Sequence, residues 1–198
     1  IDRKGTKYFK EKWALRDVSF RLRKGESIGI VGKNGSGKST LLQIICQTLE
    51  PTTGEIKVNG RVGALLELGS GFNPEFTGLD NIYLNATLLG LKRREIEERL
   101  DNILSFADIG ESIHQEIRTY SSGMVVRLAF AVIANIEADL LVIDEALAVG
   151  DAYFTQKCMR FIQRFRKNGT VVFVSHDPNA VLSLCDRAIL IENGKQII

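Results

Sequence analysis

The segment from Gly32 to Thr40 has the composition and spacing of a phosphate-binding loop. It reads Gly-Lys-Asn-Gly-Ser-Gly-Lys-Ser-Thr, after an apolar run and before residues with helical spacing. Glycines let such a loop fold tightly enough for its backbone N–H groups to converge on phosphate oxygens, and the start of the following helix adds a favourable field. The candidate nucleotide ligands are Gly32, Lys33, Asn34, Gly35, Ser36, Gly37, Lys38, Ser39 and Thr40.

Two side chains of this loop have distinct expected roles. Lys38 is predicted to reach the β- and γ-phosphates and so to take part in catalysis, and the Ser39 hydroxyl is predicted to bind Mg²⁺. A glycine-rich turn can match the pattern by chance, but the preceding strand and the following helix are the context that the motif requires. The loop therefore predicts nucleotide binding, without choosing among the families that use it.

Three further polar residues follow runs of buried-strand type. Asp144 and Glu145 come after Leu-Leu-Val-Ile, and His176 comes after Val-Val-Phe-Val-Ser. Hydrolysis needs one carboxylate on the metal side and another that orients and deprotonates the attacking water. We assign the first role to Asp144 and the second to Glu145, and we expect a neutral His176 to hydrogen-bond the γ-phosphate or the water. Acids or a histidine at a strand end are ordinary structural features, so these roles depend on the loop being nearby.

The elements that must position these residues alternate between strand and helix patterns. Apolar runs predict strands, and apolar residues at helical spacing predict helices. Such alternation indicates parallel strands joined by crossover helices, hence an α/β fold with ligands at the carboxyl ends of the strands. The predicted strands span 18–22, 27–31, 54–58, 61–66, 140–143, 170–175 and 187–192, with a turn at Asn59-Gly60, and the predicted helices span 38–49, 80–89, 93–107, 121–136, 152–168 and 178–185.

The overall composition is that of one globular domain. Of the 198 residues, 44% are apolar and 25% are charged, which is enough for one substantial core. The net charge of +2 provides no sustained basic stripe, so nucleic acid is not an expected partner. No apolar stretch reaches the roughly 20 residues of a membrane span. Because the chain starts without Met and stops within an apparent strand, we expect a domain excised from a longer protein.

A short element at residues 120–124 connects these features to a known family. Tyr-Ser-Ser-Gly-Met, shortly before the Asp144 strand, resembles the Leu-Ser-Gly-Gly-Gln element of ATP-binding cassette (ABC) proteins. With the acids, the Ala-Val-Gly-Asp at 148–151 and the Ser-His-Asp at 175–177, every main motif of that family stands in the family's order. The resemblance covers essentially the whole chain. It implies the ABC ATPase fold: a P-loop core with a mostly parallel sheet, an N-terminal antiparallel β subdomain and an inserted α-helical subdomain.

The resemblance also implies ATP and Mg²⁺ as cofactors and a homodimer as the working form. Ser121, Ser122 and Gly123, at a helix start, form a second anion-binding end. In the family this end closes on the γ-phosphate held by the opposite subunit, so that two nucleotides are sandwiched and a single subunit hydrolyses poorly. The expected organisation is one nucleotide-binding domain at 1–198, with the helical subdomain at approximately 79–137 and a further C-terminal domain of the full protein absent.

Several details resemble one branch of the family. Ser122 and Met124 replace the usual Gly and Gln, and the segments 65–72, 81–85 and 144–151 look like those of exporters of O-antigen, capsule or teichoic acid. This closer resemblance implies an integral membrane permease as a partner and a lipid-linked polysaccharide as the cargo. It also implies a peripheral position on the cytoplasmic face of the bacterial inner membrane.

Two expected site positions have alternatives. Glu67 is the expected stand-in for the family's metal-sensing Gln, but an ungapped comparison lands on Leu68, which has no metal-binding atom. In the family, adenine stacks on an aromatic residue upstream of the loop. Phe9 fits the general family spacing, Trp13 resembles the polysaccharide exporters, and Tyr8 is a third candidate.

Two other functions fit parts of the sequence. A soluble cassette acting on DNA or ribosomes would share the motifs, but such relatives carry a long coiled coil or a second cassette, and neither is present in this sequence. A P-loop kinase or GTPase would leave residues 121–124 unexplained, and the sequence contains no Asn-Lys-x-Asp element for guanine. Export driven by ATP hydrolysis is therefore the preferred hypothesis.

Overall fold

A mostly parallel sheet is the centre of the structure. The computed structural model describes residues 11–65, 69, 71–144 and 151–198, and within them six strands have the order β2-β3-β4-β1-β5-β6. All neighbours are parallel except β5 and β6, which are antiparallel. The predicted α/β fold is confirmed. The strands are β1 (Ser27–Val31), β2 (Val62–Leu65), β3 (Leu140–Ile143), β4 (Thr170–Ser175), β5 (Arg187–Glu192) and β6 (Lys195–Gln196).

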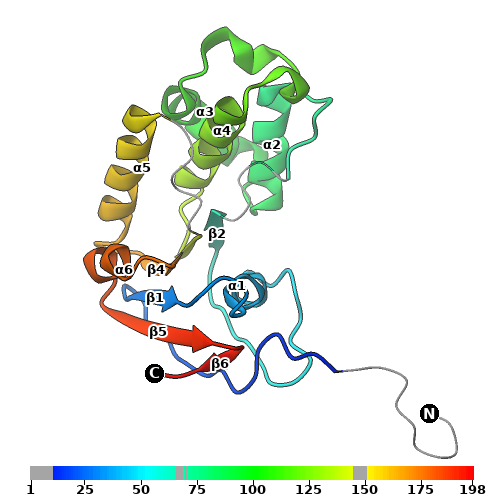
Figure 1. The fold of residues 1–198 in the computed structure, drawn as a ribbon. Coiled ribbons are helices and arrows are strands. Elements are labelled where there is room, and N and C mark those ends of the chain that lie inside the picture. Colours follow the sequence, from blue (N-terminus) through cyan, green and yellow to red (C-terminus); the bar gives the residue numbers. More distant parts are fainter. Residues whose placement is uncertain (1–10, 66–68, 70, 145–150) are drawn as a thin grey trace, which may run out of the picture.

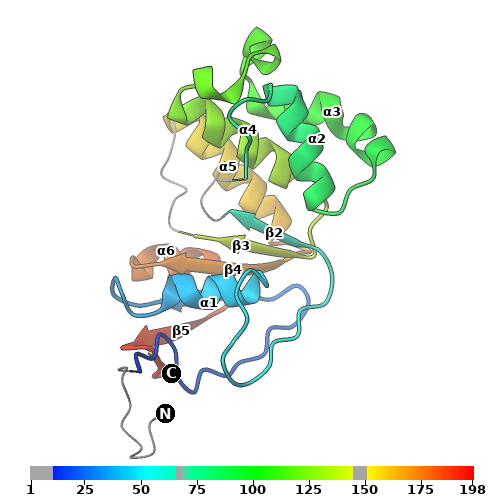
Figure 2. The same ribbon diagram turned by 90° about the vertical axis from the view of Figure 1, so that its right-hand side faces the viewer.

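Helices cover both faces of this sheet (Figures 1 and 2). On one face lies α1 (Lys38–Ile45), and on the other lie α5 (Ala152–Phe165) and α6 (Pro178–Leu184). Successive residues of a strand point to opposite faces, so Val142 joins the cluster with α1 and Leu141 joins the cluster with α5. Strands covered on both sides read as continuous apolar runs, which is why β3 and β4 were recognisable from the sequence.

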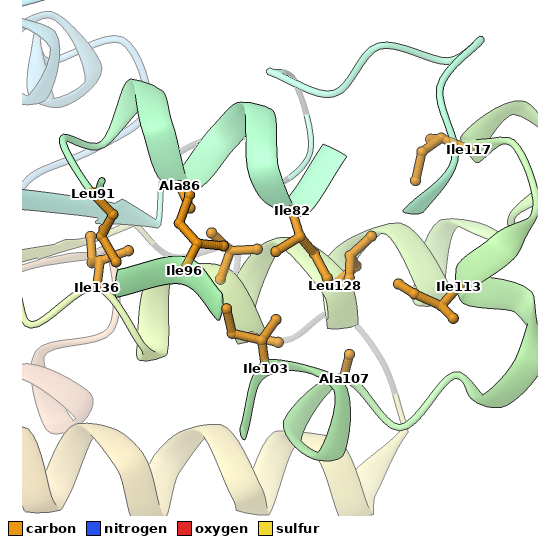
Figure 3. Close-up of a cluster of buried hydrophobic side chains, with 12 residues drawn as sticks. Ile82, Ala86, Leu91, Ile96, Ile103, Ala107, Ile113, Ile117, Leu128 and Ile136 are labelled. Atoms are coloured by element: carbon orange, nitrogen blue, oxygen red, sulfur yellow. The ribbon is translucent and has the colours of Figure 1, made fainter. Parts of the chain in front are cut away.

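A second group of helices lies beyond the β2 edge of the sheet (Figure 2). A cluster of buried apolar residues between Ile82 and Ile136 packs within this group and is separate from the two clusters of the sheet (Figure 3). The residues of this cluster lie inside the range predicted for a helical subdomain. Among the described residues, no helix is long and apolar enough to cross a membrane. The group contains α2 (Gly78–Leu88), α3 (Arg93–Ala107), the short 3-10 helices η1 (Gly110–His114) and η2 (Ile117–Thr119), and α4 (Ser122–Ala134).

Local chemistry sets the ends of two helices differently from the prediction. The Thr77 hydroxyl accepts from the Asp80 N–H at 3.1 Å, and the Asp80 carboxylate accepts from the Thr77 N–H at 3.2 Å. This capping box starts α2 at Gly78, two residues before the predicted start. In α1 the helix ends at Ile45 rather than at residue 49, because Gln47 has a left-handed φ of 59°.

The predicted strands at 18–22 and 54–58 are not formed, so the structure contains no β-ladder for an N-terminal antiparallel subdomain in residues 11–26. Side chains in 18–22 alternate between half-buried and exposed, as a strand would, and the inward ones pack on the α1 face. Their backbone forms no ladder with a described strand, and the Ser19 N–H donates instead to the Gln196 side-chain oxygen at 3.0 Å. The predicted hairpin around Gly60 is replaced by parallel pairing of β2 with β3, because Asp139 binds both the Arg61 N–H, at 2.9 Å, and the Arg61 carbonyl, at 2.8 Å.

Candidate active site

Three neighbouring strands end at one edge of the sheet and bring predicted site residues together. β1 lies beside β4, and β4 lies beside β3. The register aligns the last residues of β1 and β4, while β3 ends level with the third-last residue of β4. Gly32, Asp144 and His176 directly follow these three strands, so all of them lie along the carboxyl edge. His176 is exposed there, and Asp144 is half-buried.

The phosphate-binding loop is tight where its glycines stand. A Cβ on Gly32 would lie 2.4 Å from the Ile191 carbonyl oxygen and 2.5 Å from Ser36 Oγ, so no larger residue fits without a shift. Gly37 has a φ of 106° and precedes α1 as its N-cap, with no side-chain hydrogen bond to the helix. The first N–H groups of α1 thus receive no acceptor from the cap residue, and this is the arrangement that an anion can complete.

The Lys38 side chain is hydrogen-bonded to the backbone of this loop. This side chain is buried, and its Nζ donates to the carbonyl oxygens of Gly32, at 2.7 Å, and Lys33, at 3.0 Å. An ammonium group has three donors, so these two bonds fix the loop and leave a further donor position. Ser39, the next residue, is exposed at the start of α1. The structure therefore places the predicted lysine and the predicted hydroxyl ligand side by side in the chain at the helix N-terminus.

The electrostatics of the edge link Asp144 to the loop. Burial raises the pKa of the Asp144 carboxyl above its ordinary value, and the positive charge of Lys38 opposes that rise. The two charges therefore interact across the strand ends. The Ser39 hydroxyl and the Asp144 carboxylate are hard oxygen donors of the kind that Mg²⁺ prefers, so this donor set fits the predicted metal. Glu145 and Glu67 lie outside the described residues.

Residues 14–16 contact the same loop. A Cβ on Gly37 would lie 2.6 Å from the Ala14 carbonyl oxygen. The Arg16 N–H donates to the Gly194 carbonyl at 2.7 Å, and the Gly194 N–H donates to the Ser36 carbonyl at 3.0 Å. Residues 14–16, the loop and the β5–β6 turn are thereby joined. This junction was not predicted, because it depends on contacts between residues far apart in the sequence.

One of the three aromatic candidates for adenine is held beside this junction. Trp13 precedes the segment that touches Gly37 and is 49% exposed, with the Arg16 guanidinium 5.6 Å from its ring centroid. An exposed indole next to the loop provides a face on which a base can stack. Phe9 and Tyr8 lie outside the described residues.

The predicted second anion-binding end is the exposed start of α4. The Ser121 hydroxyl accepts from the Met124 N–H at 3.3 Å and caps the helix, Ser122 is exposed, and Gly123 is half-buried. We call residues 121–123 the serine-led turn. It begins a helix beyond the β2 edge, whereas the phosphate-binding loop begins α1 on the sheet (Figure 1). The chain does not bring these two helix starts together.

Sequence analysis missed the pairing of two segments that precede α4. Backbone hydrogen bonds join residues 74–78 to residues 115–118, among them Ile117 N–H to the Phe76 carbonyl at 3.0 Å. Asn81, next to the first of these segments, is fully buried. Its Oδ1 accepts from the Asn73 N–H at 2.7 Å, and its Nδ2 donates to the Asn73 carbonyl at 3.0 Å and to the Thr77 carbonyl at 2.9 Å. The only local signal was a polar residue in an apolar helix pattern.

Arg127 is a second residue that sequence analysis missed. Its guanidinium pairs with the Asp151 carboxylate, lies 5.2 Å from the Phe154 ring centroid and donates to the Asp108 carbonyl at 3.3 Å. The pKa of Asp151 is lowered, first by the hydrogen bond from the Phe154 N–H and then by Arg127. Arg127 therefore joins α4 to the start of α5, which follows the segment containing Glu145.

Comparison with known proteins identifies the family. Residues 15–148, more than half of the chain, match the family model described as ABC transporter. The chain belongs to the ABC transporter family. The matched range contains the phosphate-binding loop, the serine-led turn and the two acids. As a member of this family the chain is an ATP-binding ATPase.

Curated relatives in the family match nearly the whole chain. An O-antigen export system ATP-binding protein, RfbB, from Klebsiella pneumoniae is 50% identical over 193 residues, which are 97% of this chain and 77% of that protein. The ABC transporter protein AbcA from Aeromonas salmonicida is 53% identical over 93% of this chain and 60% of its own length. The teichoic acids export ATP-binding protein TagH from Bacillus cereus is 46% identical, and this ABC chain spans only 33% of it.

Solved structures support the fold of this ABC chain. A dimeric ATP-binding cassette, MJ0796, in a post-hydrolysis state bound to ADP and Pi, matches with a TM-score of 0.81 at 24% identity, over 98% of this chain and 93% of that one. A structure described as the ATP binding subunit of an ABC transporter matches with a TM-score of 0.82, also at 24% identity, over 93% of this chain and 82% of that one. At this identity the likeness concerns the fold.

Proposed function

We propose that this protein is the ATP-hydrolysing subunit of an exporter that moves a lipid-linked polysaccharide, of the O-antigen, capsule or teichoic-acid class, across the bacterial cytoplasmic membrane. One observation supports the ATP-hydrolysing part of this proposal. The ends of β1, β3 and β4 gather the loop, Asp144 and His176 at one edge, while the serine-led turn is exposed on another helix. The identity with exporter subunits supports the polysaccharide part.

In this proposal the loop and the start of α1 bind the triphosphate of ATP. The backbone N–H groups of residues 32–40 would donate to the phosphates, and the buried Lys38 ammonium would add positive charge beside them. Ser39, Asp144 and Glu67 would hold Mg²⁺, which supplies charge neutralisation at the β- and γ-phosphates when it is bound. The interaction between Lys38 and Asp144 supports a shared site for phosphate and metal.

The proton chemistry is assigned to two residues. Glu145 would accept the proton of the attacking water, since it follows Asp144 at the strand end. His176, exposed at the end of β4, would donate a hydrogen bond to the γ-phosphate or accept one from the water. Lys38 would stabilise the negative charge that shifts towards the leaving phosphate.

The functional unit in this proposal is a homodimer in which each chain completes the site of the other. The serine-led turn has an exposed helix start and belongs to a helix away from the loop of the same chain. Its N–H groups and the Ser121 hydroxyl would contact the γ-phosphate bound by the partner. Trp13 is our choice for stacking on adenine, because it stands beside the loop and exposes its ring.

Export further requires a permease that spans the membrane, with this subunit peripheral on the cytoplasmic face. The test uses the native bacterium with the gene deleted and complemented by the wild-type full-length protein or by the Lys38→Ala variant. We expect polymer to disappear from the cell surface and lipid-linked polymer to accumulate inside, with rescue by the wild type only. Surface polymer is measured by immunoblot and the internal pool by lipid extraction.

An unchanged surface polymer after deletion would contradict the export function. If such cells instead showed sensitivity to DNA damage or a defect in translation, the soluble-cassette alternative would be favoured. The Lys38→Ala control separates the need for nucleotide chemistry from the need for the protein as a scaffold.

A further inference from the structure

A groove lies between α3, the end of α4 and α5, on the part of the fold away from the site residues. Two adjoining cavities form it, with volumes of about 620 and about 340 Å³. Its floor is aromatic: the Phe106 and Phe161 rings are 6.4 Å apart, and the Phe161 and Phe165 rings are 6.0 Å apart. Ala134 and Asn135, at the end of α4, line both cavities.

The groove is near the opposite edge of the sheet from the nucleotide residues. Asn135 precedes β3, and Phe165 precedes β4, whereas Asp144 and His176 follow those strands. In Figure 1 α5 runs along the left side of the molecule, with α3 and α4 to its right. The groove therefore has no part in the proposed hydrolysis.

The rim of the groove on α5 is positively charged. From residue 152 to residue 176 the chain has five basic residues and no Asp or Glu. Among the described residues, neither Lys157 nor Arg164, the two α5 cations that line the larger cavity, pairs with a carboxylate, and neither do Arg160 and Lys167, which are near them in the chain but do not line it. Lys157 instead donates to the Ser105 and Phe106 carbonyls, at 3.1 and 3.0 Å. The rim charge outside the groove floor is therefore left to attract an external anion.

The contrast with α3 shows that the charge of α5 is unusual within this chain. On α3, Arg93 pairs with Glu97 at 3.0 Å and Arg94 pairs with Glu98 at 3.1 Å. These i,i+4 pairs neutralise the helix surface. On α5 the corresponding bonds are made to neutral groups: Arg160 donates to the Gln156 amide oxygen at 3.1 Å, and Arg164 Nε donates to the Arg160 carbonyl at 3.4 Å.

From this combination we infer that the groove binds an acidic peptide segment of a protein partner, with one bulky apolar side chain inserted over Phe106 and Phe161. Aromatic floor, concave shape and cationic rim each match one part of such a ligand. A cavity of about 620 Å³ has room for a large side chain and its neighbours. A flat bilayer surface would meet the basic rim but would not fill the concave floor between helices.

The test measures binding of fluorescein-labelled synthetic peptides of about 15 residues to the purified full-length protein by anisotropy. The probe carries Asp and Glu around a central Phe-Leu pair. One comparison peptide has Lys for every acid, and another has Ser for the Phe-Leu pair. We expect the probe to bind and each comparison peptide to bind at least about tenfold more weakly, with affinity falling as salt rises.

Two variants locate the binding. Arg164→Glu reverses the charge at the rim, and Ala134→Trp fills the groove between the two cavities. Each variant is expected to bind the probe peptide about tenfold or more weakly than the wild type does. Lys57→Glu, an equal charge change at an exposed position on the α1 side, is the matched control and should change affinity less than about twofold. Circular dichroism and ATP turnover report whether each variant remains folded.

Three results would overturn the inference: no binding of the probe, binding that folded Arg164→Glu and Ala134→Trp proteins retain, or binding that the Ser-substituted peptide matches. Phosphatidylglycerol vesicles are tested in parallel. If the wild type binds these vesicles but not the peptide, the basic rim contacts lipid and the peptide assignment is wrong. None of these outcomes bears on the hydrolysis site, whose activity is read separately.

Discussion

The helix starts of α1 and α4 both offer backbone N–H groups to an anion, yet the chain surrounds them differently. At α1 the cap residue is Gly37, which makes no side-chain bond to the helix, and Lys38 and Asp144 interact beside it. At α4 the cap is Ser121, whose hydroxyl already accepts from the third residue of the helix, and the turn is exposed. The α1 start is bonded and charged within its own chain, and the α4 start is exposed.

The difference suggests a division of labour. In the proposed function the α1 start would contribute charge, metal ligands and a base, and it would therefore determine affinity and chemistry. The α4 start contributes an exposed, neutral set of donors, so it is suited to closing on a ligand that another chain holds. Substitutions on the two sides should therefore separate binding, dimerisation and turnover.

The largest loss of ATP turnover is expected for Glu145→Gln. Loss of a general base lowers rates by about 10² to 10⁴, while the amide keeps the size of the side chain. ATP binding and ATP-dependent dimerisation should persist. Steady-state turnover and size-exclusion chromatography with ATP measure both. Turnover equal to that of the wild type would reject Glu145 as the base.

Ser121→Glu tests the exposed start by placing a negative charge where the γ-phosphate of the partner should lie. We expect turnover to fall by about 10² to 10³, comparable to the loss of an anion-stabilising donor, while ATP binding to the single chain stays within about twofold. Mixing this variant with Lys38→Ala provides the sharpest form of the test. Each mixed dimer contains one site with an intact loop and an intact turn, so activity should reappear on mixing. Two variants that stay inactive when mixed, although they form mixed dimers, would contradict shared sites.

Lys38→Ala tests the start of α1. Removing a charged donor to phosphate should weaken ATP binding by about 10- to 10²-fold. Lys33→Ala is the control, because Lys33 is in the same loop but its side chain is exposed. Titration with a fluorescent ATP analogue measures both variants. Equal affinities for Lys38→Ala and the wild type would argue against the assignment of the phosphate-binding loop.

The smallest effect is expected at the adenine end. Trp13→Ala should weaken ATP binding by up to about tenfold, since an aromatic stacking contact contributes roughly 0.5 to 1.5 kcal/mol. The effect should be smaller for inorganic triphosphate, which has no base. Phe9→Ala and Tyr8→Ala are the comparisons, and a larger loss for either would transfer the stacking role to that residue.

Local patterns in the sequence were sufficient for much of the molecule. Apolar runs predicted β1, β3, β4 and β5, and the residues directly after three of them predicted the edge along which Gly32, Asp144 and His176 lie. Parallel strands collect their carboxyl ends at one edge, so this part of the site follows from strand order alone. The helix starts at Lys38 and near Ser121 were predicted from the helical spacing of the residues that follow them.

Other features were decided only by contacts between distant residues. The segments 18–22 and 54–58 have strand-like patterns, but strands exist only beside hydrogen-bonding neighbours, and Asp139 directs β2 into the parallel sheet instead. Residues 14–16, which follow Trp13, are joined to Gly194, and the loop at residues 73–77 is bonded to the buried Asn81. The uncompensated charge of α5 became visible only once the neighbours of each cation were known. Residue type and spacing therefore determined which chemistry is present, and packing determined which groups meet, because burial and pairing act between residues that the sequence separates.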